Sequence, residues 1–597
     1  MLKGIETGIK SFRLLAQLRS GGAIGAYAVN GISPQFVADF NGDAYFVGGD
    51  ASTLSGALVH SRADATPIAT YTDSTGNLQT VATAGAARTE NHIWDVEQGA
   101  TVNPLGDELI ALSDGQSAGN IVVDETAGTV TRAAGTTSET VTIGATPASS
   151  GLSNGDVVQV TFTVSDFVLA SGTAGVGWSS SSCFAGLGFA DRFVSGNGVY
   201  EKNLVIQNAN AAFLFGFVDG SQGAISNISI KEINPWVKGY LHESEARTNL
   251  ITYSGDFTDT SWVKGGDSEV SKDAIGPDGI TSATTLSDNS EGDNNIVRIT
   301  HSVTVSTTTA YTYSAFLKAD QLGWAILWAE NFTTPANGGA YFNLSSGSIG
   351  TVSSGFSAAI EDTGNGWYRC SITFTTDAAD TSGTVEIYVA DGDGDPFVDL
   401  DGTSSILIYG AQFEQGSTPS SYIPTAGSTV TRAADVMTIP IENIPYPTGA
   451  SLAVSIAVEG YMTYAVDQTP RILYPFRWDL NTQNKIQVYY DTEAGVLDWY
   501  FLQEEADILD SVNTTSEPTP AGINVPFSIA SRHGSTFING AVDGTALTAN
   551  TTPVAFPALS TTDMSLFPTG NFHITKFRMW GKANGDIGDT GIAEPSS

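Results

Sequence analysis

RTNLITYSGDFTDTSW, at residues 247–262, opens the stretch of sequence that decides the fold, and GAQFEQGSTPSSYIPTAGSTVTRAAD, at residues 410–435, closes it. Between these ends lie short runs in which apolar and polar residues alternate, such as YTYSAFL at 311–317 and GTVEIYV at 383–389. Gly, Asp, Asn or Ser separates each run from the next. Short alternating strands with frequent turn signals are typical of an all-β sandwich.

The composition extends this prediction to the rest of the chain. With 65 glycines, 41% hydrophobic residues and only 15% charged residues, the chain favours short strands joined by tight turns over helices. Its 597 residues exceed what one hydrophobic core usually supports, so several domains are expected. The fold class predicted is all-β, with tandem jelly-roll and concanavalin-like β-sandwich modules and a short N-terminal α-helix.

Charge and targeting signals exclude some classes of partner. The formal net charge of −38 repels phosphate backbones and anionic lipids, which argues against nucleic acid as a partner. Any ligand of this acidic surface is instead expected to be neutral, cationic or bridged by divalent ions. The sequence shows neither an apolar run long enough for a membrane span nor the apolar core of a secretory signal, so synthesis in the cytosol is expected. Cys183 and Cys370 lie in different modules and are interpreted as small buried hydrophobes.

The strand pattern divides the chain into six segments. They are a docking and attachment segment at 1–34, a β-rich lead-in at 35–99, a jelly-roll-like sandwich at 100–236, a central module at 237–436, a concanavalin-like sandwich at 437–582 and a flexible tail at 583–597. The run TVTRAA occurs twice, at 129–134 and at 429–434. This short identity hints that two of the modules are related.

Near the N-terminus, apolar residues recur at helical spacing. They are Ile5, Ile9, Phe12, Leu15 and Leu18. A helix with this stripe could lie on a membrane surface, pack on its own domain, or bury the stripe against a partner protein. We favour docking to a partner, because nothing later in this acidic chain supports residence at a membrane.

The motifs at the two ends of the central module also carry a resemblance. RTNLITYS at 247–254, GAQFE at 410–414, SYIPT at 421–425 and TRAAD at 431–435 resemble a module of bacteriophage fibre and spike proteins. The resemblance implies a jelly-roll sandwich similar to carbohydrate-binding modules. Such a module is often followed by a concanavalin-like, laminin-G-type sandwich, which residues 437–582 resemble. The run ATYTDSTGNLQT at 69–80 is similar to the lead-in of these proteins, so the module at 100–236 is interpreted as an insertion.

The resemblance implies a function as well. It implies a protein exposed on the virion surface, assembled in the host cytoplasm, commonly a homotrimer, and bound to other virion proteins through the N-terminal helix. Its expected partner is host surface polysaccharide, bound without cleavage, with attachment to the tail favoured and the head left open. Two alternatives stand beside this prediction: a structural head fibre or capsid-decorating protein that binds no glycan, and a tailspike that depolymerises capsule.

Four aromatic residues of the central module are candidates for glycan binding. They are Trp324, Trp328, Trp367 and Tyr368. Exposed aromatic rings stack on the apolar face of a pyranose while polar side chains bind its hydroxyls. Trp324 and Trp328 are four residues apart and would share one face of a strand. The alternative for each tryptophan is a place in the core between the two sheets.

An acidic loop is the candidate metal site. Asp391, Asp393 and Asp395 alternate in ADGDGDPFVDLDG at 390–402, as carboxylate ligands of a calcium loop do. Pro396 and Gly402 depart from the helix-flanked calcium-loop signature. The loop is therefore predicted either as a calcium site between strands or as a solvated acidic turn.

No motif for catalysis stands out. The six histidines show no zinc-binding spacing. GQSAG at 115–119 and GLSNG at 151–155 match the letters of a nucleophile elbow, but each leads into a predicted strand where the elbow needs a helix. We therefore expect the chain not to be an enzyme.

Overall fold

The fold is known from a computed structural model of the 597-residue chain. Near the N-terminus it describes residue 28 and residues 33–93, without 41–43, 48–49, 65, 67, 73–76 and 82–85. Between residues 94 and 235 it describes residue 197 and nine strands. From there on it describes residues 236–581, without 290–291, 293–294, 448–451, 466–471, 494–495, 516–518 and 520–521, and then residues 587, 588 and 592. The chain forms two compact units, Met1–Ile93 with Lys238–Ser597, and Trp94–Val237.

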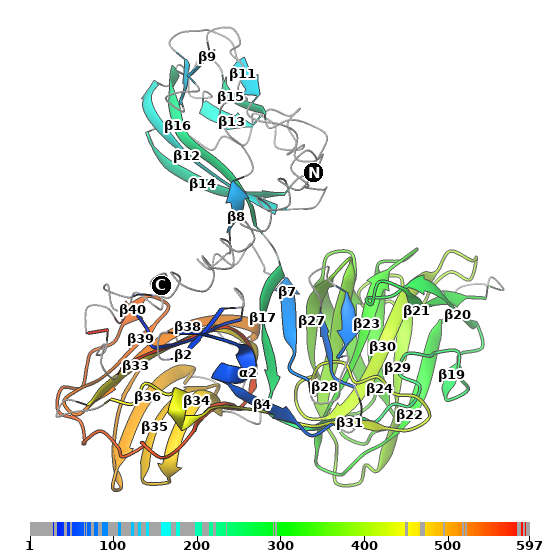
Figure 1. Cartoon of the computed structure of the whole chain (residues 1–597). Coiled ribbons are helices and arrows are strands. Elements are labelled where there is room, and N and C mark those ends of the chain that lie inside the picture. Colours follow the sequence, from blue (N-terminus) through cyan, green and yellow to red (C-terminus); the bar gives the residue numbers. More distant parts are fainter. Residues whose placement is uncertain are drawn as a thin grey trace, which may run out of the picture. The chain divides into compact units, whose positions relative to one another are not determined.

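The central module is a sandwich of two six-stranded antiparallel sheets. One sheet has the strand order β19 (Trp262–Lys264), β22 (Arg298–Thr304), β29 (Ser382–Ala390), β24 (Trp324–Glu330), β25 (Gly338–Asn343), β26 (Ser348–Val352). The other has the order β20 (Ser268–Ile275), β21 (Thr281–Asp288), β30 (Ser405–Gln415), β23 (Ala310–Ala319), β28 (Trp367–Thr375), β27 (Ser357–Gly364). Alternate residues of these strands point inward and form one core. The predicted all-β sandwich is confirmed (Figure 1).

The opening and closing motifs meet at one end of this sandwich. β18 (Arg247–Asn249) pairs with β31 (Val430–Arg432). The side-chain amide of Asn249 donates to the carbonyls of Ala411, at 3.1 Å, and Ile423, at 2.9 Å. Its Oδ1 accepts from the backbone N–H of Phe413 at 3.2 Å. One buried asparagine of the opening motif therefore satisfies three backbone groups of the closing motif, which the chain must do wherever a strand ends inside the protein.

The C-terminal sandwich also has two sheets. The larger has ten strands, in the order β3 (Asp50–Ser52), β2 (Ala44–Val47), β1 (Phe36–Asp39), β42 (Asn571–Trp580), β33 (Ala453–Ala465), β38 (Gly522–Gly534), β39 (Ile538–Val542), β40 (Thr545–Ala546), with β17 (Trp236–Glu243) on β42 and β7 (Thr89–Ile93) on β17. The smaller has the order β37 (Ile508–Asn513), β36 (Asp498–Glu505), β35 (Asn484–Asp491), β34 (Ile472–Asn481), β41 (Met564–Thr569), β32 (Asp435–Ile439), β4 (Val59–Arg62).

Residues of the predicted lead-in build part of this C-terminal sandwich. β1 pairs with β42, and β4 pairs with β32, so strands from residues 36–62 extend both of its sheets. Figure 1 shows these blue strands among the orange and red ones. A second pair from the lead-in, β5 (Thr70–Thr72) with β6 (Leu78–Thr80), forms a hairpin. The only helices described are the short α2 (Leu54–Ala57) and the 3-10 turn η5 (Ile441–Asn443).

A buried ion-pair cluster joins the lead-in, the end of the central module and the C-terminal sandwich. It contains three arginines and three carboxylates, Arg62, Arg88, Arg432, Asp64, Glu243 and Asp435. All six side chains are at most 2% exposed. The formal charges of the cluster cancel, as buried charges must if folding is not to be penalised heavily.

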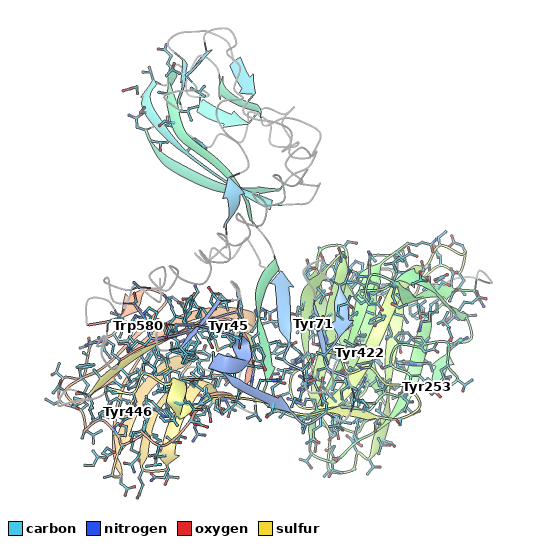
Figure 2. The ribbon with its side chains drawn as sticks, viewed as in Figure 1. Tyr45, Tyr71, Tyr253, Tyr422, Tyr446 and Trp580 are labelled. Atoms are coloured by element: carbon cyan, nitrogen blue, oxygen red, sulfur yellow. The ribbon has the colours of Figure 1, made fainter. Side chains whose placement is uncertain are left out.

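Two residues of the predicted flexible tail are packed into the protein. Ile587 and Ile592 are 1% and 0% exposed, in a cluster with Trp580. Trp580, labelled in Figure 2, ends β42. The backbone N–H of Ile587 donates to Ser455 Oγ at 3.3 Å. The two isoleucines are the large apolar residues of a polar tail, and both pack in the cluster of Trp580.

The second unit contains two antiparallel sheets of its own. One has the order β14 (Gly198–Val205), β12 (Val157–Val168), β16 (Gln222–Ile233), β10 (Thr129–Arg132), β9 (Ile121–Asp124), with β8 (Leu105–Glu108) also on β16. The other has the order β11 (Glu139–Thr142), β15 (Leu214–Val218), β13 (Gly175–Trp178). The strands predicted to follow the two GxSxG runs are confirmed as β9, from Ile121, and β12, from Val157. The two GxSxG runs and Cys183 lie outside the described residues.

The connectivity makes this unit an insertion, and it predicts that the unit can be excised. The chain leaves the first unit on β7 and returns on β17, which pairs with β7. Replacing residues 94–237 with a short Gly-Ser linker is expected to change the unfolding free energy of the first unit by no more than about 0.5 kcal/mol. Denaturant unfolding of the shortened and full chains measures this. A deletion extended to residue 243 is the control, and it should unfold the unit because it removes β17.

Candidate binding face on the central sandwich

The two outer faces of the central sandwich differ in what covers them. On the sheet that contains β23 and β28, Phe316, Trp367 and Tyr422 are at most 4% exposed and form a buried cluster. Leu78 of the lead-in packs against this cluster, and Tyr422 of the closing motif is labelled in Figure 2. This outer face is therefore covered by the chain itself. On the outer face of the other sheet, Ile326, Tyr341 and Tyr388 are also at most 9% exposed, but Trp324 and Trp328 are only partly buried.

This second outer face carries a band of aromatic residues. On β24, Ala325, Leu327 and Ala329 point into the core. Trp324, Ile326 and Trp328 therefore point to the opposite side, because successive residues of a strand alternate. Tyr341 on β25 and Tyr388 on β29 are both register partners of Ile326. Together these side chains form one cluster on the outer face of the sheet.

Both tryptophans of this band are half-buried and outside the core. The alternative that they belong to the core between the sheets is therefore wrong, because the other side of β24 faces that core. Their separation of four residues corresponds to about 13 Å along a strand. The register partner of Trp328 on β25 is Gly339, so no side chain stands beside the ring there. A Cβ at Gly339 would lie 1.9 Å from the carbonyl oxygen of Leu327, so that position excludes any larger residue.

The other two candidate aromatics lie elsewhere. Trp367 is 1% exposed in the covered cluster, so its ring is closed to a ligand. Tyr368 follows it on β28 and is half-buried, packed against the core of the sandwich. Neither residue belongs to the band on β24, β25 and β29.

Polar groups are fixed beside the aromatic band. Arg298 on β22 donates to Glu386 Oε2 at 3.0 Å and to the hydroxyl of Tyr388 at 2.9 Å. The Tyr388 hydroxyl donates in turn to Glu386. Asn337 donates to Glu330 Oε1 at 2.9 Å. The guanidinium of Arg298 and the carboxylate of Glu330 remain 37% and 31% exposed, so both can still meet a ligand from solvent.

Burial and charge shift the pKa values of these groups. Burial raises the pKa of Glu386, and the nearby Glu330 raises it further, while the bonds from Tyr388 and Arg298 act in the opposite direction. Burial also raises the pKa of Tyr388, followed by its bond to Glu386. These shifts follow from the packing of one carboxylate under an aromatic layer. Glu386 thus orients Arg298 and Tyr388, and it is itself 1% exposed.

The acidic loop lies at the edge of the same band. A Cβ built on Gly350 of β26 would lie 2.5 Å from Asp393 Oδ1 and 2.8 Å from the ring of Trp324, so both side chains adjoin Gly350. The backbone N–H of Thr351 donates to Asp393 at 2.6 Å. Burial, and then Asp395 and Asp393, raise the pKa of Tyr341. The structure thus brings the candidate metal loop and the candidate glycan residues together, which their separation in sequence did not indicate.

No metal centre is evident in the described part of the chain, where no three His, Cys, Asp or Glu side chains are grouped as ligands. In the acidic loop, Asp395 Oδ1 accepts from the N–H of Phe397 at 3.1 Å, and a bridge joins Gly392 and Asp395. Asp393 and Asp395 therefore already accept hydrogen bonds within the turn. Calcium binding by Asp391, Asp393 and Asp395 stays a prediction.

Sequence reasoning missed four residues of the face: Arg298, Tyr341, Glu386 and Tyr388. The sequence signal that could have found the residues on β29 is the alternation of polar or aromatic residues with Val385, Ile387 and Val389, which lie in the core. The strand order that sets β29 and β25 beside β24 was not readable from the sequence. The docking residues Ile5, Ile9, Phe12, Leu15 and Leu18 lie outside the described residues.

Comparisons with known proteins add little to this site. No family model matches the chain, and no curated protein matches it. Among solved structures, the N-terminal CBM22-1–CBM22-2 tandem domain from Paenibacillus barcinonensis Xyn10C is similar at 11% identity and a TM-score of 0.19, over 53% of this chain and all of that one. Within the described residues, no helix is long and apolar enough to cross a membrane.

Proposed function

We propose that the chain is a bacteriophage virion fibre or spike protein that attaches to host cell-surface glycans through the face of Trp324 and Trp328. The observation that carries the proposal is the aromatic band on one sheet of the central sandwich, with its two partly exposed tryptophans and its fixed polar groups. Two partly exposed indoles can stack on separate sugar units of one chain, while Arg298 and Glu330 bind hydroxyls. The trimeric state and the tail location belong to the same proposal.

The setting on a virion is supported by the motifs at both ends of the central module, which resemble those of phage fibre and spike proteins. In this setting, weak binding at one face is multiplied by the copies in an oligomer. The band also has more acidic than basic neighbours, since Glu330, Glu386 and Asp393 adjoin it along with Arg298. A neutral or amino-bearing glycan therefore suits the face better than an acidic one.

The carboxylates beside the band favour binding without cleavage. Glycosidases keep their two carboxyl groups about 5–5.5 Å apart when they retain configuration and about 6.5–9.5 Å apart when they invert it. Glu330 and Glu386 are within hydrogen-bonding reach of each other, and Glu386 is also bonded to Arg298 and Tyr388. Two carboxyl groups this close match neither glycosidase spacing.

Trp328→Ala is expected to weaken binding of a host polysaccharide by at least about tenfold, because a central tryptophan typically contributes about 2 kcal/mol or more to an interface. Isothermal titration with purified surface polysaccharide measures the effect. Trp328→Phe should keep part of the affinity. Ile280→Ala is the matched control, since Ile280 is 64% exposed at the hairpin between β20 and β21, in the other sheet.

A cell assay separates the proposed function from its alternatives. The purified protein is incubated with host cells and with envelope polysaccharide, and both blocking of phage adsorption and release of soluble sugar are scored. Blocking without sugar release is expected. Release would show a depolymerase, and the absence of both effects would show a structural fibre.

A further inference from the structure

We propose that the chain has a second glycan-binding surface, formed by Tyr474, Tyr489 and Tyr500 on the outer face of the seven-stranded sheet of the C-terminal sandwich. It would take a neutral or amino-bearing sugar chain. This inference goes beyond the function proposed above, and it relies on that function only for the chemical class of the ligand.

The register of the sheet places the three tyrosines away from the core. Tyr489 on β35 is paired with Tyr500 on β36. Their neighbours Tyr490 and Trp499, also paired, are 0% exposed in the core of the sandwich. Tyr489 and Tyr500 therefore point to the opposite face, where they and Tyr474 of β34 are half-buried. Three adjacent strands thus each contribute one ring to the same outer face.

The rings form a continuous strip. Tyr489 and Tyr500 are stacked, with centroids 4.8 Å apart and planes at 14°. Tyr474 lies 5.5 Å from Tyr489 at 57°. The stacked pair leaves one face of Tyr489 toward Tyr474 and one face of Tyr500 on the side of β37. Because stacking fixes the rings before a ligand arrives, little side-chain entropy is lost on binding.

Neighbouring side chains hold the strip in place. The guanidinium of Arg477 lies 5.1 Å from the ring centroid of Tyr474 and bonds Asp479. Gln487 donates to the same aspartate at 2.9 Å. Arg477 is therefore engaged both by the ring of Tyr474 and by the carboxylate of Asp479. This arrangement supplies a rigid floor, as sugar-binding sites require.

Charge decides which sugar fits. Asp491 and Asp498 are paired two residues along β35 and β36 from the tyrosines. Burial raises the pKa of Tyr500, and Asp498, Asp491 and Glu493 raise it further. Burial, then Tyr500, raise the pKa of Tyr489 to about 12. The phenols stay neutral and can donate to sugar oxygens. The carboxylates accept from hydroxyls or amines and repel acidic sugars.

Titration of the full chain with defined oligosaccharides tests the proposal. The probes are hexasaccharides of neutral glucan, mannan and galactan, of chitosan, and of an acidic polyuronate. We expect two sites per chain for a neutral or amino-bearing probe, one site in Tyr500→Ala, one in Trp328→Ala and none in the double variant. With the matching polysaccharide, each single variant should lose up to about a hundredfold of apparent affinity.

Each of the other possible outcomes contradicts a specific part of the two proposals. One site that is lost in Trp328→Ala and kept in Tyr500→Ala would refute the second surface and leave the proposed function standing. One site lost only in Tyr500→Ala would do the reverse. Binding of the polyuronate alone would refute the ligand class, and the absence of all binding would contradict both proposals. If Tyr500→Ala changes the oligomeric state in sedimentation, a second copy of the chain covers the strip, which also refutes it. Tyr500→Phe and thermal melting exclude misfolding as the cause.

Discussion

Asp435→Asn is expected to lower the free energy of unfolding of the first unit by about 3–5 kcal/mol, the typical loss when one partner of a buried ion pair is removed. Asp435 Oδ1 accepts from Arg62 at 3.1 Å and from His60 at 3.3 Å. Its Oδ2 accepts from Arg88 and, at 2.9 Å, from the backbone N–H of Glu243. An amide in its place would turn an N–H toward at least one of these donors.

The size of this effect follows from the charge that would remain. Burial acts to raise the pKa of Asp435, but Arg88 and the bond from His60 outweigh it and hold the pKa well below its usual range. Arg88 is itself fully buried, and it also donates to Glu243 at 2.5 Å. Without the Asp435 carboxylate, three buried arginines would face two carboxylates, Asp64 and Glu243. An uncompensated guanidinium in the interior is among the most destabilising changes a substitution can make.

Denaturant unfolding of purified Asp435→Asn measures the effect. Asp401→Asn is the matched control, because Asp401 lies at an exposed turn where it accepts from Thr403, and its unfolding midpoint should not move measurably. A midpoint for Asp435→Asn equal to that of the control would mean that the cluster is hydrated in solution. The burial described here would then be contradicted.

This cluster explains why the motif TRAAD could be recognised from sequence while its role could not. Arg432 and Asp435 belong to that motif, and their partners Glu243 and Arg88 are supplied from distant parts of the chain. So is Asp64, which accepts from the backbone N–H of Ala433. Alternation of apolar residues predicts strands, but it contains no information about which strands will be neighbours. The earlier copy of TVTRAA is followed by Gly135 instead of an aspartate, so it lacks the residue that closes the cluster.

The same limit applies to the two candidate surfaces. The spacing of Trp324 and Trp328 correctly predicts one shared side of a strand. How exposed each outer face is depends on residues far from β24 in sequence. Leu78 and Tyr422 cover the other sheet, and Asp393 adjoins Trp324. For Tyr474, Tyr489 and Tyr500, each ring belongs to a different strand, so only the pairing of those strands reveals a strip.

Acid is expected to destabilise the first unit strongly, beginning near pH 6.5. His242 and His533 are buried and have no hydrogen-bond partner for either ring nitrogen among the described residues. Burial lowers the pKa of His242 to about 4, although Asp435 acts to raise it, and burial alone lowers that of His533 to about 3. The folded unit therefore keeps both rings neutral at a pH where the unfolded chain binds protons.

The sign follows from linkage. Because the unfolded state binds more protons than the folded state below pH 6.5, stability falls as the pH falls. Each histidine removes about 2–3 kcal/mol between pH 6.5 and 4, at about 1.4 kcal/mol per pH unit. Protonation of Glu243 causes a second loss of stability at lower pH. Burial acts to raise its pKa, but Arg432 and Arg88 lower it to about 2, so its contribution is present above about pH 4.5 and disappears as the pH falls toward 2.

His533→Leu separates the histidine effect from the carboxylate effect. Urea unfolding of the original chain at intervals from pH 8 to pH 4 should show a loss of several kcal/mol. In His533→Leu the loss should be smaller by the share of one histidine, about 2–3 kcal/mol. Leucine also removes an unpaired polar ring from the core, which favours the folded state. The altered packing acts against it, by under about 1.5 kcal/mol for a swap of similar volume. The free energy of unfolding at pH 7 should therefore not fall by more than that amount. An unchanged slope in this variant would mean that His533 is protonated in the folded protein, and hence that a charge or water reaches a site that the structure shows as closed.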